Sequence, residues 1–152
     1  MNVSSAFASL DLDALKAELG DGTFTVYSVA RPLSADLPVD RSGVLAQLTF
    51  ASPAFAPATD GGETPIFTEE AAMGQSVGTP GFVRLCKEDG TVVADLSAGP
   101  GRREVKFTEV SVSKGAPVKV ASLRFLEDGS WPERPDYYDA HPKSGYEMPK
   151  TL

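Results

Sequence analysis

Short stretches of this chain alternate apolar and polar residues, and glycine or proline separates most of the stretches. The clearest case is 44–50, where Val44, Ala46, Leu48 and Phe50 fall on one face. A period of two places successive side chains on opposite faces of a strand. With 14 Gly and 12 Pro among 152 residues, turns are frequent and long helices are few. The pattern therefore predicts short strands joined by turns.

Strand signals recur between residues 23 and 126. They fall on 23–29, on 44–50, on a hairpin of 81–87 with 91–96, and on a hairpin of 105–113 with 117–126. In the first hairpin, Asp89-Gly90 favours a type I′ turn, in which both residues need a positive φ. In the second, strict alternation places Val118 on one face and Leu123 on the other. Strands at this spacing predict an all-β fold, an antiparallel β-sandwich or barrel-like domain.

The N-terminal segment predicts one helix over 5–19. Leu12, Leu15 and Leu19 form an apolar stripe, which we expect to pack on the sheet, with a partner-facing helix as the alternative. Three residues can cap the first turn: Ser4, Ser5 and Asp11. Gly20 stands where a left-handed glycine ends a helix.

The last 25 residues, 128–152, hold four prolines and no apolar periodicity. We predict an extended C-terminal arm there, after an N-terminal helix and cap at 1–22 and a β-sandwich domain at 23–127. Fully extended, the arm reaches about 80 Å. Docking on a partner, wrapping of its own domain and disorder all stay open for it. The candidate partner-binding residues are Trp131, Tyr137, Tyr138, Tyr146 and Met148.

The charge balance bears on the partners. The formal net charge is −7, and an acidic surface repels nucleic-acid phosphates and anionic lipids. We therefore predict neither a nucleic-acid nor a membrane partner. No apolar run is long enough for a membrane-spanning helix, and residues 1–9 show no secretory signal. Arg102-Arg103 is a local basic spot, either a docking point for an acidic neighbour or an ordinary solvated loop.

Catalytic and metal-binding groups are few. His141 is the single His and Cys86 the single Cys, too few for a zinc cluster and unpromising for a nucleophile with its base. Asp11 and Asp13 have the spacing of the first two ligands of a calcium-binding loop, but the Gly and Glu that such a loop requires are missing. We therefore assign the two aspartates to the start of the helix. Cys86 is predicted to be a buried apolar residue, with a reactive thiol as the alternative. We predict no enzyme and no cofactor.

Four segments carry a resemblance to known proteins. They are Thr25-Val26-Tyr27-Ser28 with Arg31-Pro32, Leu45–Phe50 with Pro53-Ala54-Phe55, Phe82–Leu85 with Asp89–Val93, and Ser111–Phe125 with Gly115-Ala116. In order and spacing they resemble a family of small virion proteins of tailed bacteriophages. The resemblance covers about two-thirds of the chain, and this family carries no catalytic residues to transfer. Segment 64–75 and the arm depart from its pattern.

The resemblance implies a β-sandwich and a non-enzymatic structural role in the virion, which is assembled in the host cytoplasm. The first expectation is a capsid decoration or cement protein, a homo-oligomer or multicopy component that binds the major capsid protein or neighbouring copies. The alternative is a tail or baseplate module that binds a host receptor or glycan through the loops around Phe67 and Glu69. A hydrolase on this fold is the third hypothesis; it would need a cleft where acidic and His side chains converge.

Overall fold

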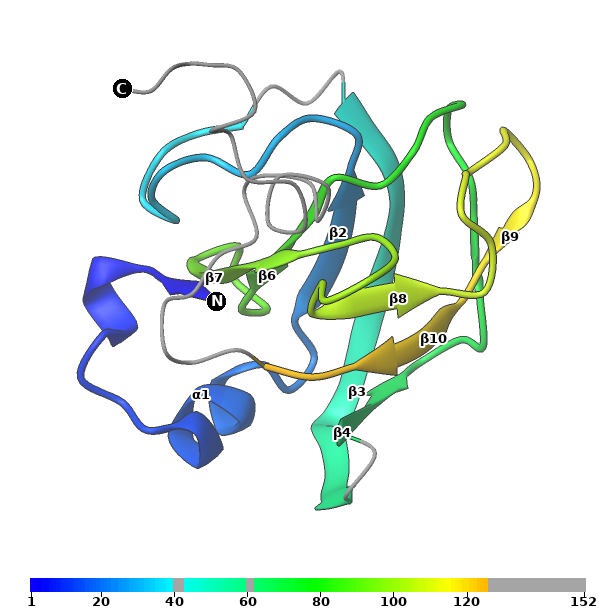
Figure 1. Cartoon of the computed structure of the whole chain (residues 1–152). Helices are drawn as coiled ribbons and strands as arrows, with labels where there is room; N and C mark the ends of the chain where they lie inside the picture. The colour runs from blue at the N-terminus through cyan, green and yellow to red at the C-terminus, as the bar shows by residue number, and fades with distance from the viewer. Residues whose placement is uncertain (40–42, 60–61, 126–152) are drawn as a thin grey trace, which may run out of the picture.

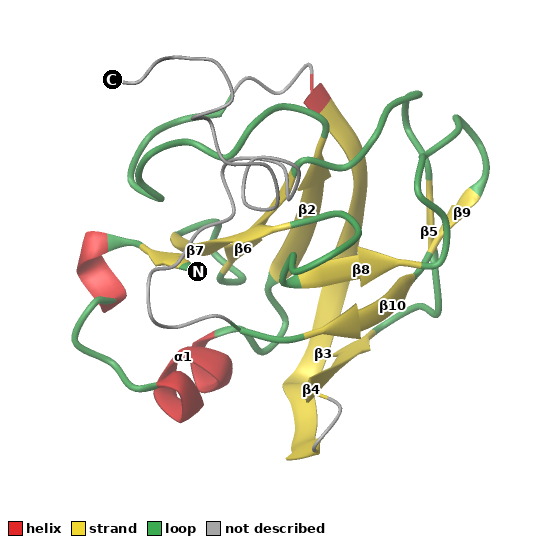
Figure 2. Cartoon of the chain, viewed as in Figure 1, coloured by secondary structure: helices red, strands yellow, loops and turns green. Residues whose placement is uncertain are grey.

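The computed structural model describes residues 1–39, 43–59 and 62–125. The strands run in the order β1 (Asn2–Val3), β2 (Thr23–Tyr27), β3 (Val44–Thr59), β4 (Gly62–Phe67), β5 (Ala72–Met73), β6 (Phe82–Cys86), β7 (Val92–Ser97), β8 (Val105–Phe107), β9 (Pro117–Val118) and β10 (Val120–Leu123). A 3-10 turn (Ser5–Phe7) and the helix α1 (Leu12–Glu18) lie between β1 and β2. The prediction of an all-β fold is confirmed (Figure 2).

The main sheet has eight strands in the order β1-β7-β6-β2-β3-β4-β10-β8, paired antiparallel, and β5 with β9 forms a small second sheet. The main sheet curls until its two ends meet, where Ala98 after β7 bridges to Val105 of β8 (Figure 1). We call β7, β6, β2 and β3 the paired half, and β4, β10 and β8 the split half. The core fills the space that this curl encloses.

Phenylalanines join the two halves of the sheet. The Phe24 ring of β2 lies 5.2 Å from that of Phe67 in β4 and 6.4 Å from that of Phe107 in β8. Phe50 of β3 stacks on Phe67 at 5.2 Å. Aromatic pairs at these separations add to the burial of their own surface. Phe55 of β3 and Phe67 of β4 therefore face one core.

The predicted β6–β7 hairpin is confirmed, but its predicted turn is wrong. Gly90 alone of the turn residues has a positive φ, 92°, and its N–H donates to the Lys87 carbonyl at 2.9 Å. A register shift between Leu85 and Cys86 marks a bulge beside the turn. An ordinary turn followed by a left-handed glycine, with a bulge, connects two strands as well as a type I′ turn does. The bulge was not visible in the Asp-Gly dipeptide.

The second predicted hairpin is shorter than expected. β8 ends at Phe107, and the return segment is divided into β9 and β10. The register of β10 shifts between Val120 and Ser122, so the strict alternation is interrupted. As a result Val118 and Leu123, predicted on opposite faces, are both buried. One extra residue in a strand is enough to exchange its faces.

The predicted helix over 5–19 is wrong in its extent. Asp11 has an extended backbone (φ −78°, ψ 175°) and its Oδ1 accepts the Ala14 N–H at 2.8 Å, so α1 begins after it. This confirms Asp11 as the cap. Leu15 and Leu19 lie in the core as predicted. The left-handed residue after the helix is Asp21 (φ 60°) and not Gly20.

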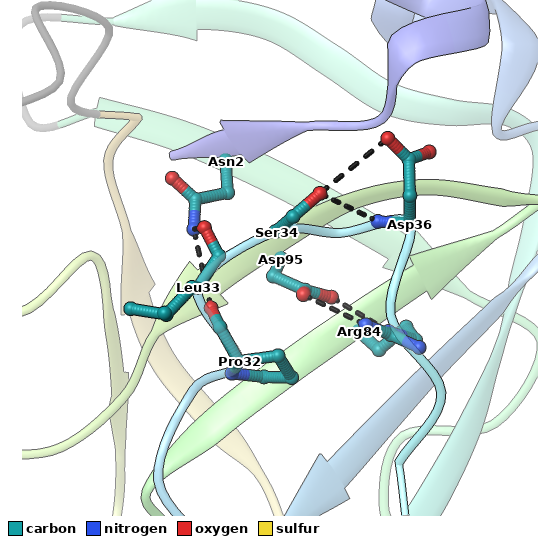
Figure 3. Close-up of polar contacts among 7 residues, drawn as sticks. All are labelled: Asn2, Pro32, Leu33, Ser34, Asp36, Arg84 and Asp95. Carbon is teal, nitrogen blue, oxygen red and sulfur yellow. Dashed lines mark hydrogen bonds and ion pairs between the residues drawn. The ribbon is translucent and has the colours of Figure 1, made fainter.

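A loop covers the outer face of the paired half. We call 31–38 the cover loop; it lies over β6 and β7 (Figure 3). Beneath the loop region Tyr27 stacks on Phe82 at 4.9 Å. Asn2 of β1 donates from Nδ2 to the Pro32 and Leu33 carbonyls, both at 3.4 Å. The outer face of this half is therefore a second packed layer.

Candidate functional site

The predicted arm residues lie outside the described residues. These are Trp131, Tyr137, Tyr138, Tyr146 and Met148, together with His141. The structure does place the point at which the chain leaves the sheet. The Phe125 ring lies 5.7 Å from that of Phe55, and the Arg124 N–H donates to the Glu104 carbonyl at 2.8 Å. Phe125, the last described residue, is therefore held in place beside β3.

Arg102 and Arg103 lie in the loop between β7 and β8. Arg102 is exposed and Arg103 is half-buried. The loop turns at Gly99 and Gly101, which have positive φ values of 128° and 80°. The two arginines thus lie on a turn, and their docking role stays a prediction.

Glu104, the next residue, was not singled out from the sequence. Its side chain is completely buried, and Oε1 lies 3.2 Å from the N-terminal ammonium of Met1. The Ser97 N–H donates to the same oxygen at 3.1 Å, and the Glu104 N–H donates to Ser97 Oγ at 2.8 Å. Buried charge is tolerated when it is paired in this way. Glu104 therefore fixes the loop that carries Arg102 and Arg103.

A row of polar side chains crosses the paired half. In register it runs Asp95, Arg84, Thr25, Gln47. Arg84 donates to both carboxylate oxygens of Asp95, from Nε at 2.7 Å and from Nη2 at 2.9 Å (Figure 3). Burial raises the pKa of Asp95 against the opposing pull of Arg84. Burial also works to lower the pKa of Arg84, but the hydrogen bond and charge of Asp95 outweigh it, and that pKa is raised.

A pocket of about 310 Å³ adjoins this ion pair beneath the cover loop. Its polar groups are mostly committed to the protein itself. Asp36 accepts the Ser5 N–H at 3.1 Å and the Ser5 hydroxyl at 3.2 Å, while Arg84 is held by Asp95. The buried Ser4 hydroxyl has no hydrogen-bond partner among the described residues. We assign this pocket to the seating of the cover loop and the first turn.

A groove of about 410 Å³ separates β4 from β10. One wall is formed by 63–67 with 69–70 and the other by 119–122. Lys119 Nζ lies 2.9 Å from Glu70 Oε1 across it, and this contact lowers the pKa of Glu70. Next to it a depression of about 220 Å³ is lined by Gln47, Thr49, Thr68 and Glu69, among others. We call the larger one the β4–β10 groove.

Among the described residues, three of the four most exposed large apolar side chains lie at the end of the molecule that carries β5 and β9; the fourth, Leu33, lies in the cover loop. Met73, Val77 and Val110 are 70%, 77% and 67% exposed. They lie on two segments, 72–78 and 110–118. Backbone hydrogen bonds of Gly74 and Gly78 join these two segments. We call these segments the tip (Figure 2, right). Exposed apolar clusters of this kind are typical of binding surfaces.

The surroundings of Phe67 and of Cys86 indicate packing roles for both side chains. Phe67 packs between Phe24 and Phe50, so it is not an exposed platform for a sugar ring. Cys86 is half-buried, and burial raises the pKa of its thiol. A raised pKa disfavours the thiolate, which agrees with the interpretation of Cys86 as a packing residue.

The described residues bring together no group of His, Cys, Asp and Glu that could hold a metal ion. Among them, no helix is both long and apolar enough to cross a membrane. Comparisons with protein-family models, curated proteins and solved structures found no match to this chain. The groove and the tip were not predicted, because strand divergence and loop pairing depend on contacts between distant segments.

Proposed function

We propose that this protein is a non-enzymatic structural component of a tailed-bacteriophage virion. In this proposal it is a decoration or cement protein, present in many copies, that binds the major capsid protein or neighbouring copies. The two halves of the curled sheet serve as the two layers of a β-sandwich, and 128–152 is an extended arm. Binding energy, and no bond-making step, is its contribution to the particle.

The position of the resemblance segments supports the proposal. Three of the four segments include most of β2, the first part of β3 and the β6–β7 hairpin. These strands are consecutive neighbours in the sheet, in the order β7-β6-β2-β3. Segments separated by up to about fifty residues thus form one contiguous block, as a shared fold requires.

The exposed apolar side chains of the tip are the main observation in favour of a binding role. Leaving Met73, Val77 and Val110 in water costs solvation free energy that contact with another protein would recover. The arm supplies a second contact, since ordering 25 residues costs more than its four aromatic rings return unless a wide surface supports them. Many weak contacts repeated over a particle give high avidity.

The test uses particles banded from a lysate of the protein's source. We expect the full chain to band with the particles and the chain lacking 128–152 to stay in the soluble fraction while keeping its β-sheet circular dichroism. Val77→Asp tests the tip, with Leu33→Asp as the control on an apolar side chain that is 86% exposed outside the tip. Normal incorporation of both the truncated chain and Val77→Asp would contradict the proposal.

The alternative is a tail or baseplate module that binds a receptor or glycan. The depression lined by Gln47, Thr49, Thr68 and Glu69 favours it, because amide, hydroxyl and carboxylate groups are those that hydrogen-bond sugars. Copy number separates the two functions. Stoichiometry near that of the capsid protein supports decoration, and a handful of copies per particle supports the tail.

A further inference from the structure

We infer that the β4–β10 groove receives residues 128–152 of a second copy of this chain. The inference rests on the proposed function, since it names the surface to which the arm of a neighbouring subunit binds. It is argued from how the two strands separate, from the chemistry of the groove, and from the direction in which the chain leaves β10.

The two strands touch at one end and then diverge. At Gly62 the backbones are so close that a Cβ atom would lie 2.5 Å from the Leu123 carbonyl oxygen. The Arg124 N–H points to Glu104 on the β8 side, so the backbone groups of Leu123 face β4 and pair with Glu63. In a strand, the backbone N–H and C=O groups of residues i and i+2 point toward the same neighbouring strand. Pro65 therefore presents to β10 an edge without an N–H.

Opposite Pro65, β10 carries its own irregularity. The register shift between Val120 and Ser122 leaves Ala121 outside the ladder with β8. A missing donor on one strand and a bulge on the other prevent the ladder from continuing past Glu63. The groove is therefore a product of the sequence at these two points, and it stays open at Ala121, which is exposed.

The surface of the groove suits a proline-rich, aromatic segment. Its apolar groups are half-buried side chains such as Ile66 and Val120. Glu63 is paired with Lys16 at 2.9 Å and Glu70 with Lys119 at 2.9 Å, which leaves Glu69 as the exposed carboxylate at the rim. Extended proline-rich chains dock through side chains without needing a continuous ladder. Segment 128–152 offers four prolines and four aromatic rings; its three basic residues are outnumbered by five acidic ones, so the match rests on its proline and aromatic side chains.

The direction of the chain favours a second copy. β10 runs out of the groove toward Leu123, and Phe125 then packs on Phe55 beyond its closed end. An arm of the same copy would have to reverse direction to lie beside Ala121. The 27 residues after Phe125 span up to about 90 Å when extended, whereas a domain of this size has a radius of gyration near 14 Å. The arm can therefore reach a neighbouring subunit.

The test is photo-crosslinking of the full chain at high concentration. A benzophenone amino acid is placed at Ala121 in one isotopically labelled copy, which is mixed with unlabelled chain. We expect cross-links from residue 121 to peptides of 128–152 that carry the other isotope. The control places the same group at Ala17, an exposed position of α1 outside both the groove and the tip. Cross-links confined to one isotope, or no cross-link to 128–152, would overturn the inference.

A blocking variant separates this inference from the proposed function. Ala121→Arg fills the groove, and we expect at least about tenfold weaker self-association by sedimentation velocity, with Ala17→Arg, at an exposed alanine of α1 outside both the groove and the tip, unchanged. If Ala121→Arg associates normally and still bands with particles, while deletion of 128–152 abolishes banding, the groove is not the receptor and the virion role stands. If neither Ala121→Arg nor deletion of 128–152 affects banding, the arm has no role in the groove or in the virion.

Discussion

The two halves of the sheet differ in the continuity of their backbone pairing, and two of their ion pairs differ in burial. In the paired half, β2 and β6 match residue for residue over five pairs, from Thr23–Cys86 to Tyr27–Phe82. In the split half, β4 and β10 are paired at Leu123–Glu63. The continuous ladder leaves no room between its strands, whereas the interrupted one opens a groove of about 410 Å³. One half is a scaffold, and the other supplies a surface.

One ion pair from each half illustrates how far burial differs between charges of the same molecule. In the paired half, the side chains of Arg84 and Asp95 are 7% and 0% exposed and satisfy each other through two hydrogen bonds. In the split half, Lys119 and Glu70 are 43% and 84% exposed. An ion pair in water contributes little to stability, but breaking a buried one leaves an unpaired charge in a poor solvent. Breaking the Arg84–Asp95 pair should therefore cost more stability than breaking the Lys119–Glu70 pair.

The largest effect is expected at Arg84. Arg84→Ala leaves the Asp95 carboxylate buried without its partner, and we expect a loss of about 3–5 kcal/mol in the free energy of unfolding, measured by urea titration. The matched control is Lys119→Ala in the split half, for which we expect no measurable shift of the unfolding midpoint. Equal effects of the two substitutions would erase the contrast between the halves.

A double variant tests whether the loss comes from the orphaned charge. Arg84→Met with Asp95→Leu removes both charges and keeps similar volume. We expect it to regain most of the stability that Arg84→Ala loses, because two apolar side chains need no partner. If the double variant is as unstable as the single one, packing and not charge accounts for the loss.

An intermediate effect is expected where α1 meets the split half. Lys16 Nζ lies 2.9 Å from Glu63 Oε1, and the two side chains are largely buried. Lys16→Met keeps the carbon chain over Phe55 but removes the charge. We expect a loss of about 1.5–3 kcal/mol, the range for a hydrogen bond to a charged group. Glu18→Gln, on the same helix at an exposed pair with Lys87, is the control. A change no larger than the control's would place this pair with the surface ion pairs.

Local sequence patterns were sufficient for most strands of the paired half. Alternation and turn residues placed β2, the start of β3, and the β6–β7 hairpin, because each is set by neighbours in the chain. They failed over 5–19, where a stripe beginning at Leu12 was extended back to Ser5 although Asp11 already caps a shorter helix. The start of a helix is predicted correctly only when the capping residue and the apolar stripe are considered together.

The split half and the candidate surfaces were harder to predict for a physical reason. The β10 bulge allows both Val118 and Leu123 to face the core, and no residue type at 121 marks it. The burial of Glu104 depends on Met1 and Ser97, which come from distant parts of the chain. Pro65 was the one available signal, since a proline inside a strand indicates that one edge is unpaired. The arm residues lie outside the described residues, so their role stays a prediction.

The smallest effect is expected in the β6–β7 turn, and it depends on pH. The Thr91 N–H donates to Asp89 Oδ1 at 2.9 Å, and this bond holds the pKa of Asp89 below its ordinary value of 3.8. The native state then binds the proton less tightly than the unfolded chain does. The contribution of Asp89 to stability is therefore fully present above its ordinary pKa and is lost as the pH falls below that value.

Asp89→Asn keeps an oxygen that can accept the Thr91 N–H but removes the titration. We expect its unfolding midpoint to fall less steeply than that of the parent chain between about pH 5 and pH 2. Glu88→Gln, at an exposed position of the same turn, is the control for the removal of one carboxylate. Parallel curves for the parent and Asp89→Asn would mean that the turn is held by Gly90 and its bulge alone. The regular ladder of the paired half would then owe its register to backbone geometry without help from this carboxylate.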